Sequence, residues 1–224
     1  MSKSKIWYFE NFNIFEGFSQ EQLLEIANQT AMKSVSKGEY IYFLNEMSDK
    51  IYLLKEGSIK IGTYTDDGRE VVKAELRQGE LFGEMALTDE GIRQDFAQAL
   101  EKVKYCIFDL AMIDKMVETN PKLSLKITKI VGFRLRKVEN KLADLVFKDA
   151  RTRIVDFLKD QASQYGKPIG TETLIWNKLT HKDIASLTAT SRQTVTTILN
   201  DLRTKNMIYF DRKRILIRDL ENLV

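Results

Sequence analysis

The sequence is poor in the side chains that most catalytic and metal sites require. It has one cysteine, Cys106, and one histidine, His181, among 224 residues. A single cysteine excludes a disulfide within the chain, and it excludes a zinc or iron–sulfur site that one chain builds from several cysteines. No phosphate-cradling loop or metal cluster is visible, and the paired acids Asp66 and Asp67 are typical of a turn. We therefore predict that the protein is not an enzyme.

Long hydrophobic runs are absent as well. The N-terminal segment MSKSKIWYFENF contains only four consecutive apolar residues, too few for a signal peptide. No window of the sequence approaches the length of a membrane span. We therefore expect no membrane partner and a cytoplasmic location.

The composition is that of a globular protein, with 43% hydrophobic and 30% charged residues. A length of 224 residues favours two domains, each able to bury a core. Residues 1–147 carry 21 basic and 23 acidic side chains, whereas residues 148–224 carry 14 and 9, a net charge of +5. The smaller, basic part suits a polyanionic partner, although lysine-rich surfaces also serve solubility.

Short β-favouring runs separated by glycines fill the region between Lys33 and Asp109. This spacing predicts an antiparallel sandwich or barrel, with Asp66-Asp67-Gly68 as a hairpin turn. Before it, the segment from Ser19 to Gln22 has the pattern of a capping box, which predicts a short helix packed on the sheet. The expected strands are Tyr40–Leu44, Ile51–Leu54, Ile59–Tyr64, Val71–Leu76 and Tyr105–Phe108.

A long helix is predicted after Asn120-Pro121, which supply a helix cap and a proline for the first turn. It continues for about seven turns to a domain boundary near Lys148, beyond which a second helix from about Ala150 to Tyr165 is expected. Apolar residues of the long helix recur at spacings of four and three, as in a coiled coil, which predicts a homodimer. The alternative is that this stripe packs on the chain's own sheet. The stripe consists of Val131, Leu135, Val138, Leu142 and Leu145.

Charge placement on this helix favours the dimer. With Leu135 at position a and Val138 at position d, Arg134 falls at g and Glu139 at e. These two positions meet across a parallel two-stranded coiled coil. We therefore predict that Arg134 contacts Glu139 of the partner subunit.

Two short helices joined by a tight turn are predicted near the C-terminus. Thr180 can cap the first, with Asp183 three positions later, and Ser191 can cap the second. The second helix has one apolar stripe, so the pair predicts a helix-turn-helix from about Thr180 to about Lys205. Two strands follow around a basic tip and form a wing: Met207–Phe210, Ile215–Ile217 and the tip Asp211–Arg214.

The outward residues of the second helix suit the major groove of DNA. A bidentate arginine, an amide and small hydroxyls are groups that read base edges there, whereas nearby cations and hydroxyls contact phosphates. The alternative is a winged helix used for protein contacts. The predicted base-reading residues are Arg192, Gln193, Thr196 and Thr197. The predicted phosphate contacts are Lys178, Thr180, His181, Lys182, Ser191, Thr194, Arg212, Lys213 and Arg214.

Taken together, several motifs make the chain resemble the CRP/FNR superfamily, the relatives of the catabolite activator protein, over nearly its whole length. They are Gly79-Glu-Leu-Phe-Gly-Glu84, Phe147-Lys-Asp-Ala150, and Leu179-Thr-His-Lys-Asp-Ile184 with Ser191-Arg-Gln-Thr-Val195. The resemblance implies an α+β fold with an N-terminal antiparallel β-roll like a cyclic-nucleotide-binding jelly roll, a long dimerisation helix and a C-terminal winged helix-turn-helix. The corresponding domains are residues 1–118, 119–147 and 148–224. It also implies a homodimer on a palindromic double-stranded DNA site, with RNA polymerase as a further partner.

The same resemblance bears on the DNA sequence that is read. In the family, the residue matching Arg192 reads a guanine. Its neighbour is usually a glutamate, where this chain has Gln193, and a further base-reading arginine of the activator falls on Thr197. The resemblance therefore implies an operator that differs from the activator's.

The resemblance also implies a candidate ligand pocket in the β-roll, made of Gly83, Glu84, Arg93, Gln94 and Asp95. Gly83 and Glu84 match the ribose positions of nucleotide-binding relatives. Gln94 and Asp95 stand where those relatives have an arginine and a hydroxyl for the phosphate, and Asp95 would repel an anion. Arg93 lies one residue early, and a local shift would bring it inward. We therefore expect that no cyclic nucleotide is bound.

The long helix offers no contact to a cyclic nucleotide either, because Val138 and Glu139 replace a threonine and a serine that touch the nucleotide base in the activator. No other cofactor is expected. One cysteine cannot ligate the cluster of the oxygen-sensing branch, and the position of His181 favours a DNA phosphate over haem. The predicted function is a homodimeric, sequence-specific, DNA-binding transcription regulator that does not depend on cyclic AMP. The alternative is a sensor of a cyclic nucleotide or another small molecule that acts through protein contacts.

Overall fold

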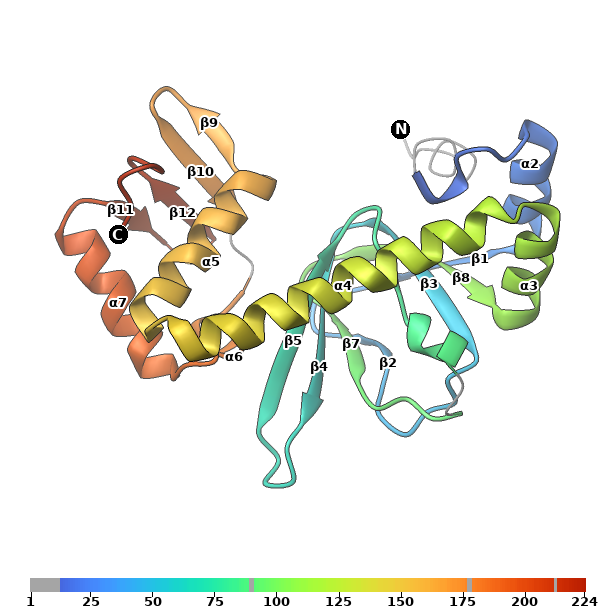
Figure 1. The fold of residues 1–224 in the computed structure, drawn as a ribbon, viewed down its shortest axis with the longest axis horizontal. Helices are drawn as coiled ribbons and strands as arrows, with labels where there is room; N and C mark the ends of the chain where they lie inside the picture. The colour runs from blue at the N-terminus through green and yellow to red at the C-terminus, as the bar shows by residue number, and fades with distance from the viewer. Residues whose placement is uncertain (1–12, 89–90, 177–178, 212) are drawn as a thin grey trace. The chain divides into compact units, whose positions relative to one another are not determined.

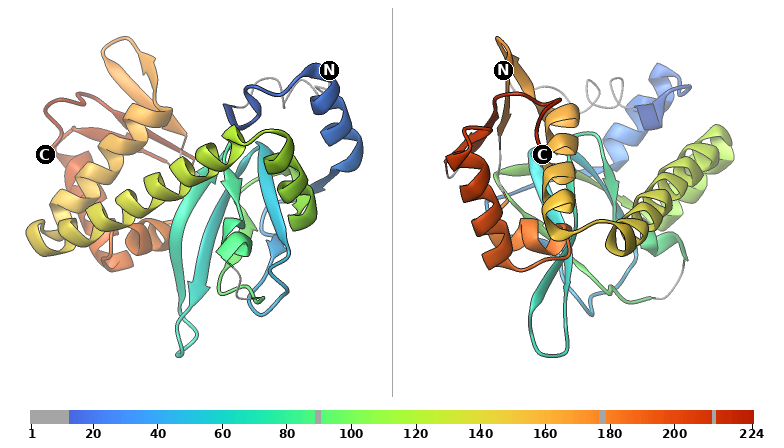
Figure 2. Two further views of the ribbon diagram at one scale, coloured as in Figure 1. Left: turned by 45° about the vertical axis from the view of Figure 1, so that its right-hand side comes forward. Right: turned by 60° about the vertical axis from the view of Figure 1, so that its left-hand side comes forward.

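The computed structural model describes residues 13–88, 91–176, 179–211 and 213–224 (Figures 1 and 2). The chain forms two compact units, residues 1–70 with 74–137 and residues 71–73 with 138–224. The division lies within the long helix α4 (Lys122–Phe147), whereas the expected domain boundary was near Lys148. The physical reason is that the first half of α4 is part of the N-terminal core, through Leu123, Ile127 and Ile130.

The N-terminal unit is an antiparallel β-roll built from two four-stranded sheets, with strand orders β1-β8-β3-β6 and β2-β7-β4-β5. The predicted antiparallel β architecture is therefore confirmed. Its strands are β1 (Ala31–Val35), β2 (Tyr40–Tyr42), β3 (Lys50–Glu56), β4 (Ser58–Tyr64), β5 (Glu70–Arg77), β6 (Leu81–Phe82), β7 (Phe96–Ala99) and β8 (Val103–Asp109). Its shorter helices are η1 (Asn13–Phe15), α2 (Gln20–Gln29), η2 (Glu84–Thr88) and α3 (Leu110–Thr119).

Helix α2 begins where its capping box predicts. The Ser19 side chain accepts a hydrogen bond from the Gln22 main-chain N–H, and the Gln22 side chain accepts one from the Ser19 N–H. Leu23 and Ile26 are buried in the same core cluster as Phe108 of β8. The predicted packing of this helix on the sheet is confirmed.

The hairpin turn between β4 and β5 is also found where it was predicted. Gly68 has a φ of +75°, a left-handed conformation that glycine adopts at little cost. Its N–H donates to the Thr65 carbonyl at 2.8 Å. All five expected strands exist, with ends displaced by one or two residues, whereas β1, β6, β7 and α3 were not predicted.

The C-terminal unit is a winged helix-turn-helix, as predicted. Its sheet has the strand order β11-β12-β10-β9. Helix α7 packs against α5 and α6, and α5 and α7 also contact the sheet, with buried aliphatic residues on these elements. The elements are α5 (Ala150–Tyr165), β9 (Lys167–Ile169), β10 (Glu172–Trp176), α6 (His181–Leu187), α7 (Arg192–Thr204), β11 (Ile208–Phe210) and β12 (Arg214–Ile217).

The apolar stripe of helix α4 is largely exposed in the single chain. Leu123 is the only residue of α4 that is classed as buried in the described chain. The stripe residues Val131, Leu135, Val138, Leu142 and Leu145 are between 44% and 60% exposed. Val131 and Leu135, which belong to the same unit as the β-roll, are therefore not buried against its sheets. Dimerisation through the stripe stays a prediction.

Candidate nucleic-acid interface

Local hydrogen bonds fix the start of both helices of the helix-turn-helix. The Thr180 side chain accepts from the Asp183 N–H, and the Asp183 carboxylate accepts from the Thr180 N–H, which completes the predicted capping box. The Ser191 hydroxyl accepts from the Thr194 N–H at 3.0 Å and so caps α7. Ala189, in the turn, has a φ of +49°. This turn and these caps set the direction in which α7 leaves the domain.

Helix α7 buries one face and exposes the other. Val195, Leu199 and Leu202 are at most 1% exposed and anchor the helix in the domain core. Arg192 and Gln193 are exposed on the first turn of the outer face. Exposed donors and amides at the start of a recognition helix are what the major groove requires for base reading.

Thr196 and Thr197 are adjacent, but the structure places them differently. Thr197 is exposed, whereas Thr196 is half-buried. The Thr196 hydroxyl donates to the Arg192 carbonyl at 2.9 Å and lies 2.8 Å from His181 Nδ1. Thr196 is thus bonded within the protein, while Arg192, Gln193 and Thr197 form the exposed group. Their role in base reading stays a prediction.

The predicted phosphate contacts on the two helices differ in whether their side chains already bond within the protein. Thr180, Ser191 and Thr194 already hydrogen bond within their own helix starts, and Ser191 Oγ lies 2.8 Å from Thr194 Oγ1. Lys182 is exposed on α6, and His181 is half-buried. Lys178 and Arg212 lie outside the described residues.

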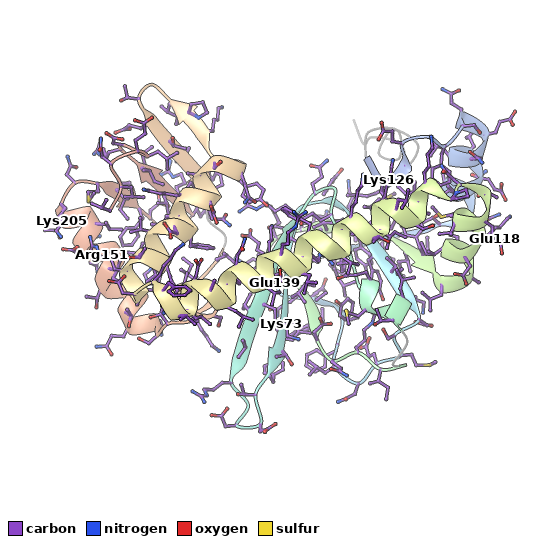
Figure 3. All side chains as sticks on the ribbon, viewed as in Figure 1. Lys73, Glu118, Lys126, Glu139, Arg151 and Lys205 are labelled. Carbon is purple, nitrogen blue, oxygen red and sulfur yellow. The ribbon has the colours of Figure 1, made fainter. Side chains whose placement is uncertain are left out.

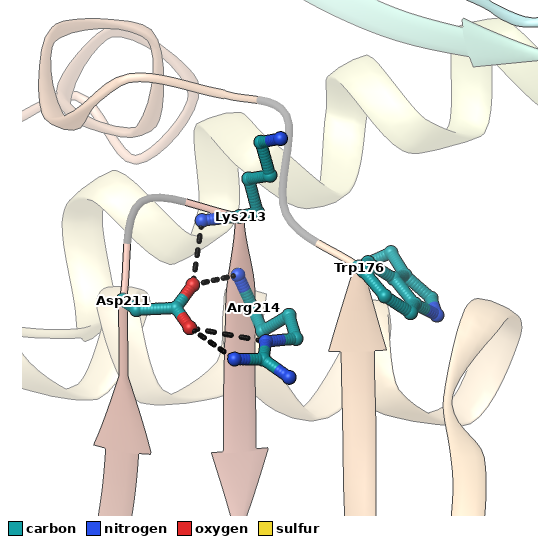
Figure 4. A pocket seen from close by; sticks show the side chains of 4 residues that line it. All are labelled: Trp176, Asp211, Lys213 and Arg214. Atoms are coloured by element: carbon teal, nitrogen blue, oxygen red, sulfur yellow. Dashed lines mark hydrogen bonds and ion pairs between the residues drawn. The ribbon is translucent and has the colours of Figure 1, made fainter.

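The wing tip is ordered by Asp211, whose carboxylate closes the turn between β11 and β12 (Figure 4). Its Oδ1 accepts from the main-chain N–H groups of Lys213 and Arg214 at 2.8 and 2.9 Å. Its Oδ2 accepts from the Arg214 guanidinium at 2.8 and 3.0 Å. The N–H of Lys213 and the Arg214 side chain together hold the pKa of Asp211 below its ordinary value. Lys213 is exposed, whereas Arg214 is partly neutralised by Asp211.

Trp176 was not predicted as part of this surface. It lines a pocket with Asp211, Lys213 and Arg214 at the wing tip (Figure 4) and is 50% exposed. It is the last residue of β10 and pairs with Arg214 of β12. The sequence showed only β-prone residues here, and the sheet order that brings β10 next to β12 could not be derived from them.

Three further basic residues hold the winged helix together. Arg151 donates to the Asp201 carboxylate at 2.6 Å, and Lys205 lies 3.0 Å from the same carboxylate; Figure 3 labels both cations. Arg153 donates through Nε to the Thr188 carbonyl, through Nη1 to the Lys148 carbonyl and through Nη2 to the Ala189 carbonyl. The guanidinium of Arg153 thus joins the end of α4 to the turn before α7.

The candidate ligand pocket in the β-roll differs from its prediction in one respect. In the segment immediately before β7, Arg93 is buried, Gln94 is exposed and Asp95 is half-buried. Arg93 therefore already points inward without a local shift, whereas Gln94 is the most exposed of the three. Gly83 has a φ of +73°, and a Cβ there would lie 2.9 Å from Tyr52 and 3.0 Å from Arg93 Nη1.

Arg93 is 3% exposed and is held on several sides. Nη1 donates to the Gly83 carbonyl at 3.1 Å, and Nη2 donates to the Lys50 carbonyl. The guanidinium lies 4.4 Å from the ring centroid of Tyr42. Burial and then the Asp95 carboxylate raise the pKa of Tyr42 well above its ordinary value. The Arg93 guanidinium, the Tyr42 phenol and the half-buried Asp95 carboxylate thus lie close together in the roll.

Glu84 of this pocket is paired with α4. Its carboxylate forms an ion pair with Arg134, and Arg134 also donates to the Leu81 carbonyl. The predicted contact between Arg134 and Glu139 of the partner subunit would have to compete with these bonds. It stays a prediction.

Among the described residues, no helix has the length and apolar character needed to cross a membrane. Across the same ranges, no cluster of three or more histidine, cysteine, aspartate or glutamate side chains has a geometry suited to a metal ion.

Two family profiles match the chain. Residues 32–120 match the cyclic nucleotide-binding domain, and residues 152–224 match the Crp-like helix-turn-helix domain. The first range covers most of the β-roll and the second covers most of the winged helix.

Relatives are similar over most of their length. The CRP-like cAMP-activated global transcriptional regulator of Mycobacterium tuberculosis is 29% identical over 210 residues, which are 94% of each chain. The global nitrogen regulator of Nostoc sp. is 27% identical over 188 residues, or 83% of this chain and 84% of that protein. A solved structure of a CooA mutant from Carboxydothermus hydrogenoformans has a TM-score of 0.77 at 24% identity and covers 100% of this chain and 95% of that chain.

Proposed function

Since the chain belongs to the CRP/FNR family of transcription regulators and carries a Crp-like helix-turn-helix DNA-binding domain, we propose that it acts as a homodimer on a specific palindromic DNA site. DNA binding in this proposal does not require a cyclic nucleotide. RNA polymerase is the further partner by which such a regulator would act on transcription.

The observation that carries the proposal is the outer face of α7. Arg192, Gln193 and Thr197 are exposed there, while the opposite face is fully packed. Arginine and glutamine are suited to bidentate contacts with guanine and adenine, and the threonine methyl is suited to thymine. A surface for protein contacts alone would not need these side chains on a capped helix start.

The exposed stripe of α4 supports the homodimer. Five aliphatic residues that are 44% to 60% exposed form one seam with coiled-coil spacing. An uncovered apolar seam of this length is costly in water, and a second copy of the same seam covers it. The two winged helix-turn-helix domains of the dimer, called heads below, would read half-sites about one helical turn apart, roughly 34 Å.

Independence from cyclic nucleotides is supported by the acids of the roll. A phosphate bound beside Arg93 would lie near the half-buried Asp95 carboxylate, and like charges repel. Glu84 is already paired with Arg134, and both terminal nitrogens of Arg93 already donate to main-chain carbonyls.

One observation favours the alternative, in which a cyclic nucleotide binds. Arg93 points into the roll beside Gly83, and its Nε has no hydrogen-bond partner among the described residues. A buried guanidinium with an unused donor suits an anion. The Mycobacterium tuberculosis relative is cAMP-activated by its name.

Selection of DNA from a random pool, followed by binding measurements, tests the main proposal. We expect selection of a palindrome, a steep fall of log affinity with log salt, and loss of specific but not general binding in Arg192→Ala. Arg69→Ala, which removes an exposed arginine paired with Asp67 in the other unit, is the matched control. If Arg192→Ala and Arg69→Ala bind the selected site equally well, the assignment of α7 as reading helix is wrong.

Isothermal titration with cyclic AMP and cyclic GMP separates the two readings of the roll. We expect no binding at micromolar ligand concentrations. Binding that Arg93→Ala abolishes and Arg69→Ala retains would establish the alternative instead.

A further inference from the structure

The single histidine of the sequence lies against the recognition helix. His181, the first residue of α6, is half-buried, and its Nδ1 lies 2.8 Å from Thr196 Oγ1 on α7. Its ring also contacts the ring of Phe210 on β11, with centroids 6.1 Å apart. The imidazole is therefore held between the two helices and the wing strand.

The partners of Thr196 favour one of the two ring nitrogens as the proton carrier. A hydroxyl has one hydrogen to donate, and that of Thr196 goes to the Arg192 carbonyl. With that hydrogen on the carbonyl, Thr196 accepts from His181, and Nδ1 carries the hydrogen in the neutral ring. Nε2 then has a lone pair, and no described residue is bonded to it.

The charges around the ring disfavour its protonation in the free protein. Burial and then the Arg192 guanidinium lower the pKa of His181. On its own helix, Lys182 follows the histidine, and the Asp183 carboxylate is turned toward Thr180. The third packed element, β11, contributes the uncharged Phe210 ring, on which the Arg203 guanidinium is stacked.

We propose that His181 is a proton-linked contact to a DNA phosphate, so that the head takes up a proton at Nε2 when it binds DNA. This inference rests on the proposed DNA-binding function. A neutral Nε2 and a phosphate oxygen are both acceptors and repel, whereas a protonated Nε2 donates to the phosphate while Nδ1 stays on Thr196. The proton comes from solvent and bonds to the Nε2 lone pair.

Linkage gives the sign of the pH dependence. The free ring titrates below its ordinary value and the DNA-bound ring titrates higher, so affinity rises as pH falls through that interval. Each unit of difference between the two pKa values gives a tenfold change in affinity per histidine. Because the sequence has one histidine, no other imidazole contributes.

The experiment measures affinity for the selected operator between pH 5.5 and 8.0 at constant salt, for the wild type and for His181→Asn. The asparagine amide replaces the Nδ1 donor to Thr196 and does not titrate. We expect wild-type affinity to be about tenfold or more greater at the acid end, and the profile of His181→Asn to be flat. Parallel profiles with intact specific binding would overturn this inference and leave the proposed function standing. Failure of the wild type to bind any selected site would refute both.

Nuclear magnetic resonance of the wild type gives a second measurement that does not depend on a variant. Long-range nitrogen–proton correlations should show the Nδ1–H tautomer in the free protein and a higher pKa in the DNA complex. An Nε2–H tautomer, or an unchanged pKa on DNA, would overturn the inference.

Discussion

Arg192 and Arg93 show how differently the two units use an arginine. Arg192 is exposed at the start of α7, whereas Arg93 is 3% exposed inside the β-roll. The first is available to a large external ligand, while the second donates to two main-chain carbonyls of its own unit. The winged helix thus presents its chemistry outward, whereas the roll confines its chemistry to the interior. A change in the head should therefore alter binding, whereas a change in the roll should alter stability first.

The largest effect is expected from separating the two copies that would carry the heads. Leu142→Glu places a carboxylate in the exposed seam of α4 and should convert a dimer to a monomer. Loss of the second head removes an effective-concentration advantage of roughly 10²–10⁴ in DNA affinity. Sedimentation velocity and fluorescence anisotropy measure the two effects. Arg136→Glu, on the same helix outside the seam, is the control, and equal behaviour of the two variants would contradict the proposed interface.

The next largest effects are expected from substituting each of the two arginines separately. Arg93→Ala leaves the carbonyls of Gly83 and Lys50 without their donor and should lower the free energy of unfolding by about 1–3 kcal/mol. Arg192→Ala should change that quantity by less than about 0.5 kcal/mol while weakening specific binding by about 1–3 kcal/mol per half-site. Urea unfolding and operator titration measure both quantities. Arg93→Met, which keeps part of the side-chain volume, separates lost packing from lost hydrogen bonds. A stable Arg93→Ala protein would show that the roll does not need its buried cation.

The smallest effect concerns the carboxylates of the head. Hydrogen bonds from Arg151 and Lys205 lower the pKa of Asp201 below its ordinary value of 3.8. A depressed carboxyl pKa stabilises the folded state above that ordinary value, and the contribution is lost as pH falls through the lower, folded value. The effect is small because the group is at the surface. Thermal melts between pH 3 and 7 should show Asp201→Asn converging with the wild type at the acid end, and a constant difference would argue against this linkage.

Local signals account for most of what the sequence predicted correctly. The caps at Ser19, Thr180 and Ser191 are hydrogen bonds within one helix turn, so the residues themselves contain the information. Strand β1 was missed because Ala31–Val35 has almost no burial and hence no alternation to detect. The side toward which Arg93 points depends on the path of the irregular segment before β7, and sequence spacing placed it one residue away from the pocket. The bond between His181 and Thr196 joins residues from two helices, and only tertiary packing creates it.

The guanidinium of Arg153 has a consequence for how the head is aimed. It donates to the carbonyl of Lys148, immediately after α4, and to the carbonyls of Thr188 and Ala189, in the turn between α6 and α7. Three hydrogen bonds from one guanidinium thus join the end of α4 to the turn that leads into α7. In the proposed dimer, the separation of the two reading helices is therefore inherited from the crossing of the α4 pair, and a lengthened α4 would change the preferred operator spacing without altering any residue that touches a base.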